Sequence, residues 1–308
     1  MRCGWCSRLL LLGLLLAFFC TGCTSVQGRI DFSREQPLAD DGTAAEESED
    51  SRPLRVAFAS VISPRDTREP YQKIVDVLSE EMQRPVVLLQ RKTYEELNQL
   101  VADGEVDVAF LSTGSYAAYR GLQPVELLAM TSTNGSVLYQ TYILVPVDSP
   151  ARDFQDLANR VFAFTDPLSY SGRMAVENQL FNLQITPETY FKRCIYTFNH
   201  DKSIWAVAHH LADGASVDSQ IYDYAVRTNP QLTSRVRILA ALPPAPTGPV
   251  VMRSNLSKED KEHLRQIFYH MHERRELQEA LQQVMIDSFV PPQEELYAPL
   301  RQKYAMRH

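Results

Sequence analysis

The alternation of short apolar runs with amphipathic stretches is the feature that most constrains the fold of this chain. Apolar runs of strand length recur between residues 54 and 253, and stretches with apolar residues at helical spacing separate many of them. We expect strands within residues 54–60, 85–90, 106–111, 125–130, 137–147, 161–164, 195–198, 215–219, 236–241 and 250–253. Strands that alternate with helices favour an α/β fold in which helices cover both faces of a mainly parallel sheet.

The strand–helix pattern occurs twice, which predicts two lobes with a cleft between them. A second α/β unit begins with the long run 137–147, and a proline-rich segment precedes the last run, 250–253. We expect the runs 139–147 and 250–253 to be the two crossings between the lobes. Lobe 1 then comprises residues 53–140 and 249–308, and lobe 2 comprises residues 141–248. Small-molecule sites tend to form between such units.

The N-terminal residues have the character of a secretory signal followed by a tether. Arg2 and Arg8 flank the start of an apolar run, 9–20, which is too short to span a bilayer comfortably. Small residues then precede Cys23, which resembles the lipobox of bacterial lipoproteins and makes Cys23 the predicted lipidation site at the end of a signal segment, 1–23. An uncleaved anchor or an ordinary signal peptide is the alternative. Residues 24–52 are rich in Asp, Glu, Ser, Ala and Gly and cannot support a core, so we expect a flexible tether on an extracytoplasmic, membrane-anchored protein.

Composition and motifs exclude several classes of function. The net charge of −7 leaves no broad basic field, so nucleic acid is not an expected partner. Beyond Cys23 only Cys194 remains, so we expect neither a disulfide framework nor a thiolate metal site, and we expect no cofactor. No nucleophile elbow, Walker loop or HExxH motif is present, and nothing in the sequence supports an enzyme.

Residues 169–172, here called the anion seat, form the most suggestive segment for binding. The expected strand 161–164 is broken by Asp166-Pro167, and Ser169-Tyr170-Ser171-Gly172 then opens a run that predicts a helix. The first amides of a helix have no partner within it, and its dipole favours negative charge there, so hydroxyls and a glycine at this point suit an anion. Simple capping of the helix by Ser169 or Ser171 explains the same residues, and the segment alone leaves both interpretations open.

An ordered set of motifs resembles one family specifically. The set consists of Leu54-Arg-Val-Ala-Phe58, Gln90-Arg-Lys-Thr-Tyr94, Gly104-Glu-Val-Asp-Val-Ala-Phe110, Ala163-Phe-Thr-Asp-Pro-Leu-Ser-Tyr-Ser-Gly172, His200-Asp-Lys-Ser203 and Asp213-Gly-Ala-Ser-Val-Asp-Ser219. Together these resemble the PhnD-type phosphate, phosphite and phosphonate-binding proteins of ABC importers over about residues 54–297. The resemblance implies a two-lobed periplasmic-binding-protein fold, type II-like, that closes on its ligand and presents it to a membrane permease.

The resemblance also implies which residues bind the ligand. The family's oxyanion contacts fall on Ser169, Tyr170 and Ser171, with Gly172 allowing close approach, and His200 matches a histidine that donates to the anion. Many relatives have threonine where this chain has Tyr170, which removes one aliphatic hydroxyl and leaves its backbone N–H. A purely structural histidine is the alternative for His200.

Three further residues carry the ligand prediction. Tyr94 and Tyr116 match tyrosines that reach over from the first lobe, although packing at the rim would also explain them. Asp218 matches a position that faces the anion, where a carboxylate repels an oxyanion unless the ligand is protonated or carries an amine. Capping of the helix that begins near Ser219 is the alternative for Asp218.

Three functions follow from these residues. The first is the substrate-binding component of an ABC importer, a monomer that captures a phosphorus oxyanion and delivers it to a permease. The second keeps the fold but reports the ligand to a membrane receptor as a sensory or adaptor module. The third, a hydrolase or transferase that uses His200 and Asp218, has no positive support. The sequence leaves the choice among phosphate, phosphite, methylphosphonate and aminoalkylphosphonate open.

Overall fold

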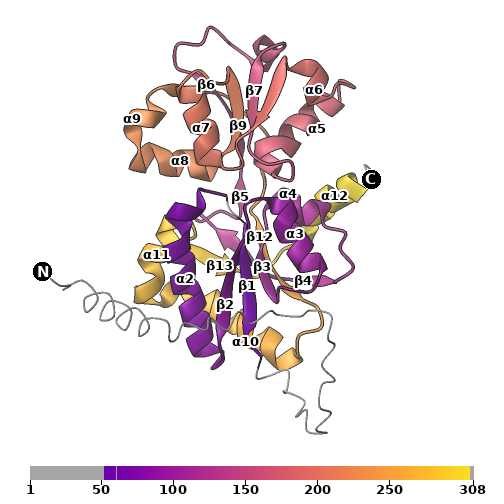
Figure 1. The fold of residues 1–308 in the computed structure, drawn as a ribbon, viewed down its shortest axis with the longest axis vertical. Coiled ribbons are helices and arrows are strands. Elements are labelled where there is room, and N and C mark those ends of the chain that lie inside the picture. Colours follow the sequence, from indigo (N-terminus) through magenta and orange to yellow (C-terminus); the bar gives the residue numbers. More distant parts are fainter. Residues whose placement is uncertain (1–51, 60, 306–308) are drawn as a thin grey trace, which may run out of the picture. The chain divides into compact units, whose positions relative to one another are not determined.

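The computed structural model describes residues 52–59 and 61–305 (Figure 1). The predicted signal segment 1–23, the lipidation site Cys23 and the tether up to residue 51 lie outside the described residues. In the described part, none of the helices combines the length and the apolar character needed to cross a bilayer.

The first lobe is built on a six-stranded sheet with the strand order β13-β4-β12-β3-β1-β2. Its strands are β1 (Leu54–Phe58), β2 (Val86–Gln90), β3 (Val108–Phe110), β4 (Val125–Ser132), β12 (Pro249–Arg253) and β13 (Ser288–Val290). Strand β1 pairs in parallel with β2 and β3, whereas β12 runs antiparallel to β3 and β4, and β13 runs antiparallel to β4. The returning C-terminal chain therefore completes the sheet that the N-terminal chain begins.

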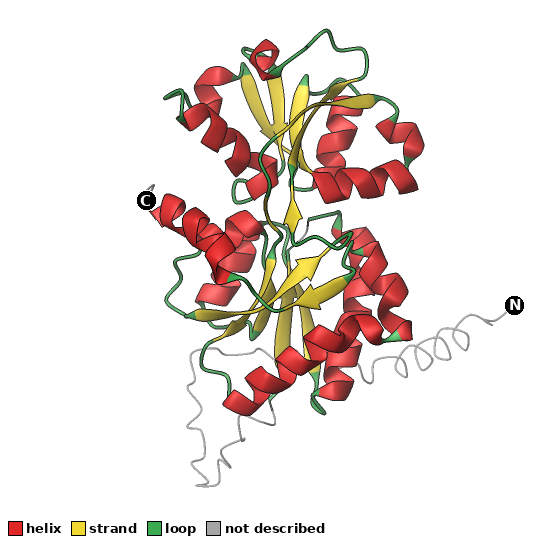
Figure 2. Cartoon of the chain, turned by 180° about the vertical axis from the view of Figure 1, so that it is seen from behind, coloured by secondary structure: helices red, strands yellow, loops and turns green. Residues whose placement is uncertain are grey.

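Helices cover both faces of this sheet, as Figures 1 and 2 show. They are α2 (Pro64–Glu81), α3 (Tyr94–Ala102), α4 (Thr113–Ala118), α10 (Lys258–His270), α11 (Gln278–Gln283) and α12 (Glu294–Ala305), with short turns η4 (Met271–Glu273) and η5 (Arg275–Leu277). On one face, Ile74 of α2 and Phe268 of α10 pack into one core cluster, and on the other, Leu97 of α3 and Tyr297 of α12 pack into a second. Helix α3 begins at Tyr94, because Thr93 and Glu96 form a reciprocal capping box there.

The second lobe has a five-stranded sheet with the order β10-β6-β9-β7-β8. Its elements are β6 (Thr141–Pro146), η2 (Phe154–Leu157), β7 (Val161–Phe164), η3 (Tyr170–Met174), α5 (Ala175–Phe181), α6 (Pro187–Tyr190), β8 (Arg193–Tyr196), α7 (His200–Ala208), β9 (Gly214–Asp218), α8 (Ser219–Thr228), α9 (Pro230–Thr233) and β10 (Val236–Ala241). Strand β7 is parallel to β8 and β9, and β6 is antiparallel to β9 and β10. Each expected strand run overlaps an observed strand.

Two sequence expectations about the sheets are wrong in detail. Both sheets are mixed rather than mainly parallel, because strands that enter from the other lobe pair antiparallel with their neighbours. The run 250–253 is not a crossing: it forms β12 inside the first sheet, between β3 and β4. The crossings are instead β5 (Leu138–Tyr139) and β11 (Ala245–Pro246), which pair with each other as a two-stranded ribbon.

A buried carboxylate links the ends of three neighbouring or nearby strands, β1, β3 and β12, on the side of the first sheet where β1 begins. The Asp107 side chain accepts hydrogen bonds from the Arg52 guanidinium at 2.6 Å and from the backbone N–H of Arg55 at 2.8 Å. The Arg253 guanidinium at the end of β12 lies 3.2 Å from the same carboxylate. Because Asp107 is only 1% exposed, its charge depends on these arginines for compensation.

We predict that Asp107→Ala lowers the free energy of unfolding by about 2–4 kcal/mol, because the substitution leaves partly buried guanidinium groups without their counter-charge and the Arg55 N–H without its acceptor. Urea denaturation followed by circular dichroism measures the change. Glu69→Ala serves as the control, since Glu69 is 81% exposed and pairs with Lys73 only on the helix surface, so its loss should cost less than about 0.5 kcal/mol. Equal effects of the two substitutions would refute the structural role of Asp107.

Candidate functional site

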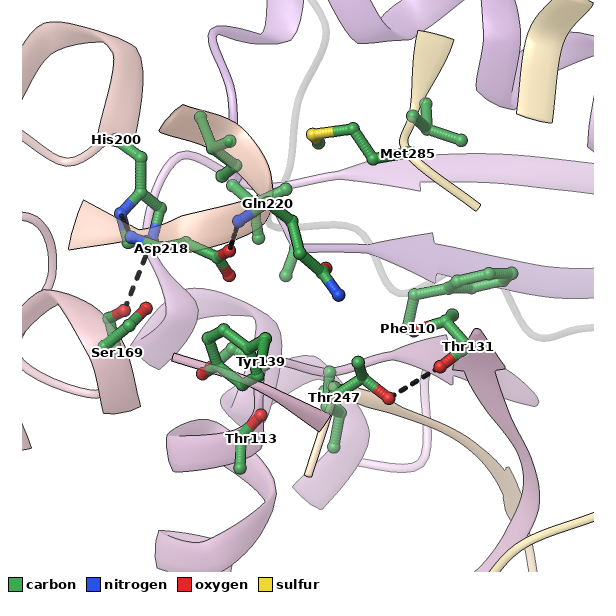
Figure 3. A pocket seen from close by; sticks show the side chains of 18 of the residues that line it. Phe110, Thr113, Thr131, Tyr139, Ser169, His200, Asp218, Gln220, Thr247 and Met285 are labelled. Carbon is green, nitrogen blue, oxygen red and sulfur yellow. Dashed lines mark hydrogen bonds between the residues drawn. The ribbon is translucent and has the colours of Figure 1, made fainter. Parts of the chain in front are cut away.

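A cavity of about 110 Å³ lies between the two lobes and beside the crossing strands (Figure 3). Residues from both sheets, from the starts of α3, α4, η3, α7 and α8, and from β5 line it, so both lobes contribute to its wall. The polar members of the lining are Tyr71, Tyr94, Ser112, Thr113, Thr131, Tyr139, Ser169, Ser171, His200, Asp218, Gln220 and Thr247. Apolar residues such as Phe110, Ile221 and Met285 line the remainder.

The anion seat forms a tight turn at the start of η3, which has π-helical hydrogen bonding. The Ser169 hydroxyl oxygen accepts from the Gly172 N–H at 3.0 Å, and the Ser169 carbonyl accepts from the Met174 N–H at 3.0 Å. Asp166 shapes the approach, because its carboxylate accepts from the Leu168 N–H at 2.8 Å and its carbonyl accepts from the Ser169 N–H at 3.0 Å. The Ser169 and Ser171 side chains both line the cavity, and the first amides of η3 have no partner within the helix.

Gly172 shapes the anion seat but does not line the cavity. A Cβ at this position would lie 2.5 Å from the Thr165 Cβ and 2.8 Å from the Ser169 Oγ, so only glycine allows the turn to pack against β7. Its carbonyl accepts from the Ser216 hydroxyl at 3.0 Å, which ties the turn to β9. The side chain of Tyr170 is likewise absent from the cavity lining and packs with Met174 and Tyr304 instead.

His200 is held as a neutral donor. Its Nδ1 accepts from the Asp218 backbone N–H at 3.1 Å, so the ring proton resides on Nε2, which lies 3.5 Å from the Ser169 Oγ. Burial lowers the pKa of His200 to about 3, and the ring is therefore uncharged at neutral pH. Because the Ser169 oxygen faces the N–H groups of Gly172 and His200, its own O–H is free to donate into the cavity.

Asp218 both caps a helix and faces the cavity. Its Oδ1 accepts from the Gln220 N–H at 2.7 Å at the start of α8, which is the capping role considered from the sequence. Burial nevertheless raises the pKa of Asp218 to about 7, so the carboxyl group gains or loses its proton close to neutral pH. It is the one charged side chain among the residues that line the cavity.

The two tyrosines that were predicted to contact the ligand, Tyr94 and Tyr116, occupy different environments. Tyr94 is 1% exposed and lines the cavity, and its hydroxyl has no hydrogen-bond partner among the described residues. Burying a hydroxyl without a partner is costly, so a ligand in the cavity is the natural partner of Tyr94. Tyr116 is not among the lining residues: its ring packs edge-on against Tyr297, and the Arg301 guanidinium lies 4.6 Å from the ring centre.

Tyr139 is the principal cavity residue that sequence reasoning missed. It lies on β5 and lines the cavity, and burial together with Asp218 raises its pKa while hydrogen bonding with the Thr113 and Ser171 hydroxyls opposes the rise. Tyr139 begins a run that the sequence predicts to cross between the lobes, and this position could have identified it as a cavity residue, because a crossing strand must border the cleft. Gln220 and Met285 were also missed, since neither belongs to a recognisable motif.

Direct contacts hold the lobes together around the cavity. The Tyr94 backbone N–H donates to the Asp166 carboxylate at 3.2 Å, and the His200 backbone N–H donates to the Val61 carbonyl at 3.2 Å. Helix α4 approaches the second lobe at Gly114, where a Cβ would lie 2.3 Å from the Leu168 carbonyl oxygen. A glycine at position 114 is therefore a condition for this closed arrangement.

The fold and cavity define a two-lobed periplasmic binding protein, and comparisons place the chain within that class. The binding-protein component of an ABC phosphonate transporter from Pseudomonas aeruginosa superposes with a TM-score of 0.74 at 22% identity, over 82% of this chain and 85% of that one. PhnD1 of Prochlorococcus marinus, solved in complex with methylphosphonate, superposes with a TM-score of 0.75 at 15% identity, over 82% and 97% of the two chains. At these identities the superpositions establish the fold.

The sequence itself establishes the family. The family model described as "ABC transporter, phosphonate, periplasmic substrate-binding protein" matches residues 56–297, and the chain belongs to this family. The phosphonates-binding periplasmic protein of Escherichia coli (strain K12) is 22% identical over 231 residues, which cover 73% of this chain and 68% of the relative. The family consists of solute-binding components of ABC transporters, and membership implies an extracytoplasmic location.

We predict that Gly114→Ala prevents the lobes from closing fully, because the added methyl group would overlap the Leu168 carbonyl and the Tyr170 amide. Hydrogen exchange at the Tyr94 amide reports closure, since this N–H reaches Asp166 in the other lobe. We expect faster exchange in Gly114→Ala than in the unmodified protein. Gly135→Ala is the control: its φ of +72° means that the new Cβ strains the local backbone, but no atom lies within 4 Å of that Cβ, so the change adds no clash between the lobes. Equal protection of Tyr94 in both variants would contradict the prediction.

Proposed function

We propose that this protein captures a small, protonated phosphorus oxyanion between its lobes and delivers it to an ABC permease. The observation that carries the proposal is the set of uncharged donors around the cavity. The Ser169 and Ser171 hydroxyls lie there, the Nε2–H of His200 is directed at the Ser169 oxygen beside them, and no lysine or arginine is among the lining residues. Directed donors of this kind can hold an oxyanion with strong, charge-assisted hydrogen bonds.

The pKa of Asp218 favours a ligand that can form a hydrogen bond with this carboxyl group in which either partner supplies the proton. With its pKa near 7, the Asp218 carboxyl can donate to an oxyanion, and as a carboxylate it can accept from a ligand P–OH group. Phosphate, phosphite and phosphonates retain or release a proton close to neutral pH, whereas sulfate remains fully ionised. A fully ionised anion can bind only when Asp218 is protonated, which favours phosphorus over sulfate.

The size and lining of the cavity favour a short substituent on phosphorus. A protein cavity of about 150 Å³ accommodates benzene, which has six heavy atoms, so 110 Å³ suits a ligand of about four or five. The apolar part of the lining, which includes Val61, Phe110 and Met285, offers a surface for a hydrogen or methyl substituent. Phosphite and methylphosphonate fit both conditions, since hydrogen or methyl replaces one polar oxygen. An aminoalkyl chain would need more room and would find Asp218 as its one carboxylate.

The remaining parts of the proposal concern the chain outside the cavity. Lipidation of Cys23 would retain the protein at the membrane, and the acidic tether that follows would let the folded lobes reach the permease. We propose that the protein acts as a monomer and without catalysis.

Calorimetric titration of the purified protein tests the ligand class. We expect tight binding of phosphite and methylphosphonate, weaker binding of phosphate and 2-aminoethylphosphonate, and no detectable heat with sulfate. Ser171→Ala should weaken the best ligand by about 1–3 kcal/mol, because the bound anion loses one donor. Ser234→Ala, which alters an exposed helix-end hydroxyl, should leave the affinity unchanged. Sulfate binding as tight as that of phosphite, or silence toward all five anions, would refute the proposal.

The pKa of Asp218 predicts a pH dependence of binding. Above about pH 7 the protonated fraction of Asp218 falls tenfold per pH unit, so affinity for an anion that cannot itself bring a proton should fall by up to the same factor. Hypophosphite is suitable because it stays singly charged throughout this range. We expect its affinity to decline between pH 7 and pH 9 in the unmodified protein and to remain nearly constant in Asp218→Asn. Parallel pH profiles for the two proteins would show that Asp218 does not supply the proton.

A further inference from the structure

Met285 adopts an unusual backbone conformation at the end of helix α11. Its φ angle is +59°, in the left-handed region that residues with a Cβ rarely occupy. The Met285 N–H donates to the Gln282 carbonyl at 3.1 Å, and the Ile286 N–H donates to the Leu281 carbonyl at 2.9 Å. These two bonds form a Schellman motif, in which glycine is the usual residue at the position of Met285.

Neighbouring contacts fix this conformation firmly. The Thr133 hydroxyl donates to the Met285 carbonyl at 2.5 Å, and the Asp287 N–H donates to the Ser132 carbonyl at 2.8 Å. The end of helix α11 and the end of strand β4 therefore both fix the backbone at Met285. Unfavourable backbone conformations persist where the surrounding structure over-determines them, and they gather at binding sites.

The Met285 side chain reaches the ligand cavity from the first lobe. It lines the cavity and packs with Ile62 of its own lobe and Ile221 of the second lobe. Figure 3 shows Met285 away from Ser169 and His200, on the side of the cavity opposite the anion seat. The side chain is 9% exposed, so it occupies space next to the ligand rather than solvent.

A second helix end provides a contrast. Gln83 follows helix α2 with a φ angle of +52°, and its side chain is exposed to solvent. There the left-handed position carries a polar residue that faces solvent. At Met285 the same unfavourable conformation instead places an apolar side chain in the binding cavity, and a glycine would satisfy the backbone but leave that space empty.

We propose that Met285 sets the size of the group attached to phosphorus, an inference that rests on the proposed function. The anion seat holds the oxygens in the second lobe, so the substituent extends toward the first lobe and meets the Met285 side chain. Hydrogen or methyl leaves the packing of Met285 with Ile62 and Ile221 intact. A longer alkyl chain displaces the thioether and separates Ile221 from the first lobe, which opposes closure.

The test compares Met285→Gly and Met285→Ala with the unmodified protein, using phosphite and methyl-, ethyl- and propylphosphonate. Glycine removes the side chain and suits the left-handed backbone, so Met285→Gly should remain folded, and Met285→Ala supplies a second removal of the same group. In the unmodified protein we expect affinity to fall from methyl to propyl. In both variants the order should reverse, with a gain of about fourfold for each methylene that becomes buried, which corresponds to about 0.8 kcal/mol.

Gln83→Gly is the matched control, because it makes the same backbone change at a helix end remote from the cavity. We expect it to leave the ligand order unchanged. An unchanged order in both Met285 variants, while the unmodified protein binds phosphite, would overturn the role of Met285 and leave the proposed function standing. If the unmodified protein binds none of the four anions, the proposed function fails and this inference fails with it.

Discussion

The hydrogen bond from the Asp218 backbone N–H to the His200 Nδ1 is the interaction on which the candidate site depends. It joins the end of β9 to the start of α7, and it fixes the imidazole proton on the nitrogen that faces Ser169. The same segment of chain places the Asp218 carboxyl group at the cavity and at the start of α8. One backbone amide thus determines the tautomer of the histidine and positions the carboxyl group beside it, and Thr165, 3.2 Å from Nδ1, completes the buried support.

The arrangement of the lobes follows from where the chain crosses between them. Strands β5 and β11 form a short ribbon, and Tyr139 on that ribbon borders the cavity. Around it, the close approach at Gly114 and the hydrogen bond from Tyr94 to Asp166 require complementary backbone surfaces on the two lobes. The cavity is consequently a property of the closed pair of lobes, since neither sheet contains all of its lining.

Local chemistry explains which features the sequence could predict. The strands, the start of α3 at Tyr94 and the turn at Ser169 depend on neighbouring residues, and Ser169, Ser171, His200, Asp218 and Tyr94 do meet at one cavity. The mixed pairing of the sheets and the insertion of β12 between β3 and β4 depend on contacts between distant segments, which periodicity does not encode. Tyr116 and Tyr139 illustrate the limit: both are tyrosines in short elements, and only the packing against Tyr297 and Arg301 distinguishes Tyr116, which does not line the cavity, from Tyr139, which does.

The absence of lysine and arginine among the residues that line the cavity has a consequence for release. A site that held its anion by ion pairs would keep much of its attraction after opening, because Coulomb forces act over long distances. Hydrogen bonds from hydroxyls, amides and a neutral imidazole act only at contact range and compete poorly with water once solvent enters. In the proposed role, a permease that separates the lobes by a small distance would therefore release the anion, because no positively charged side chain of the cavity would continue to attract it.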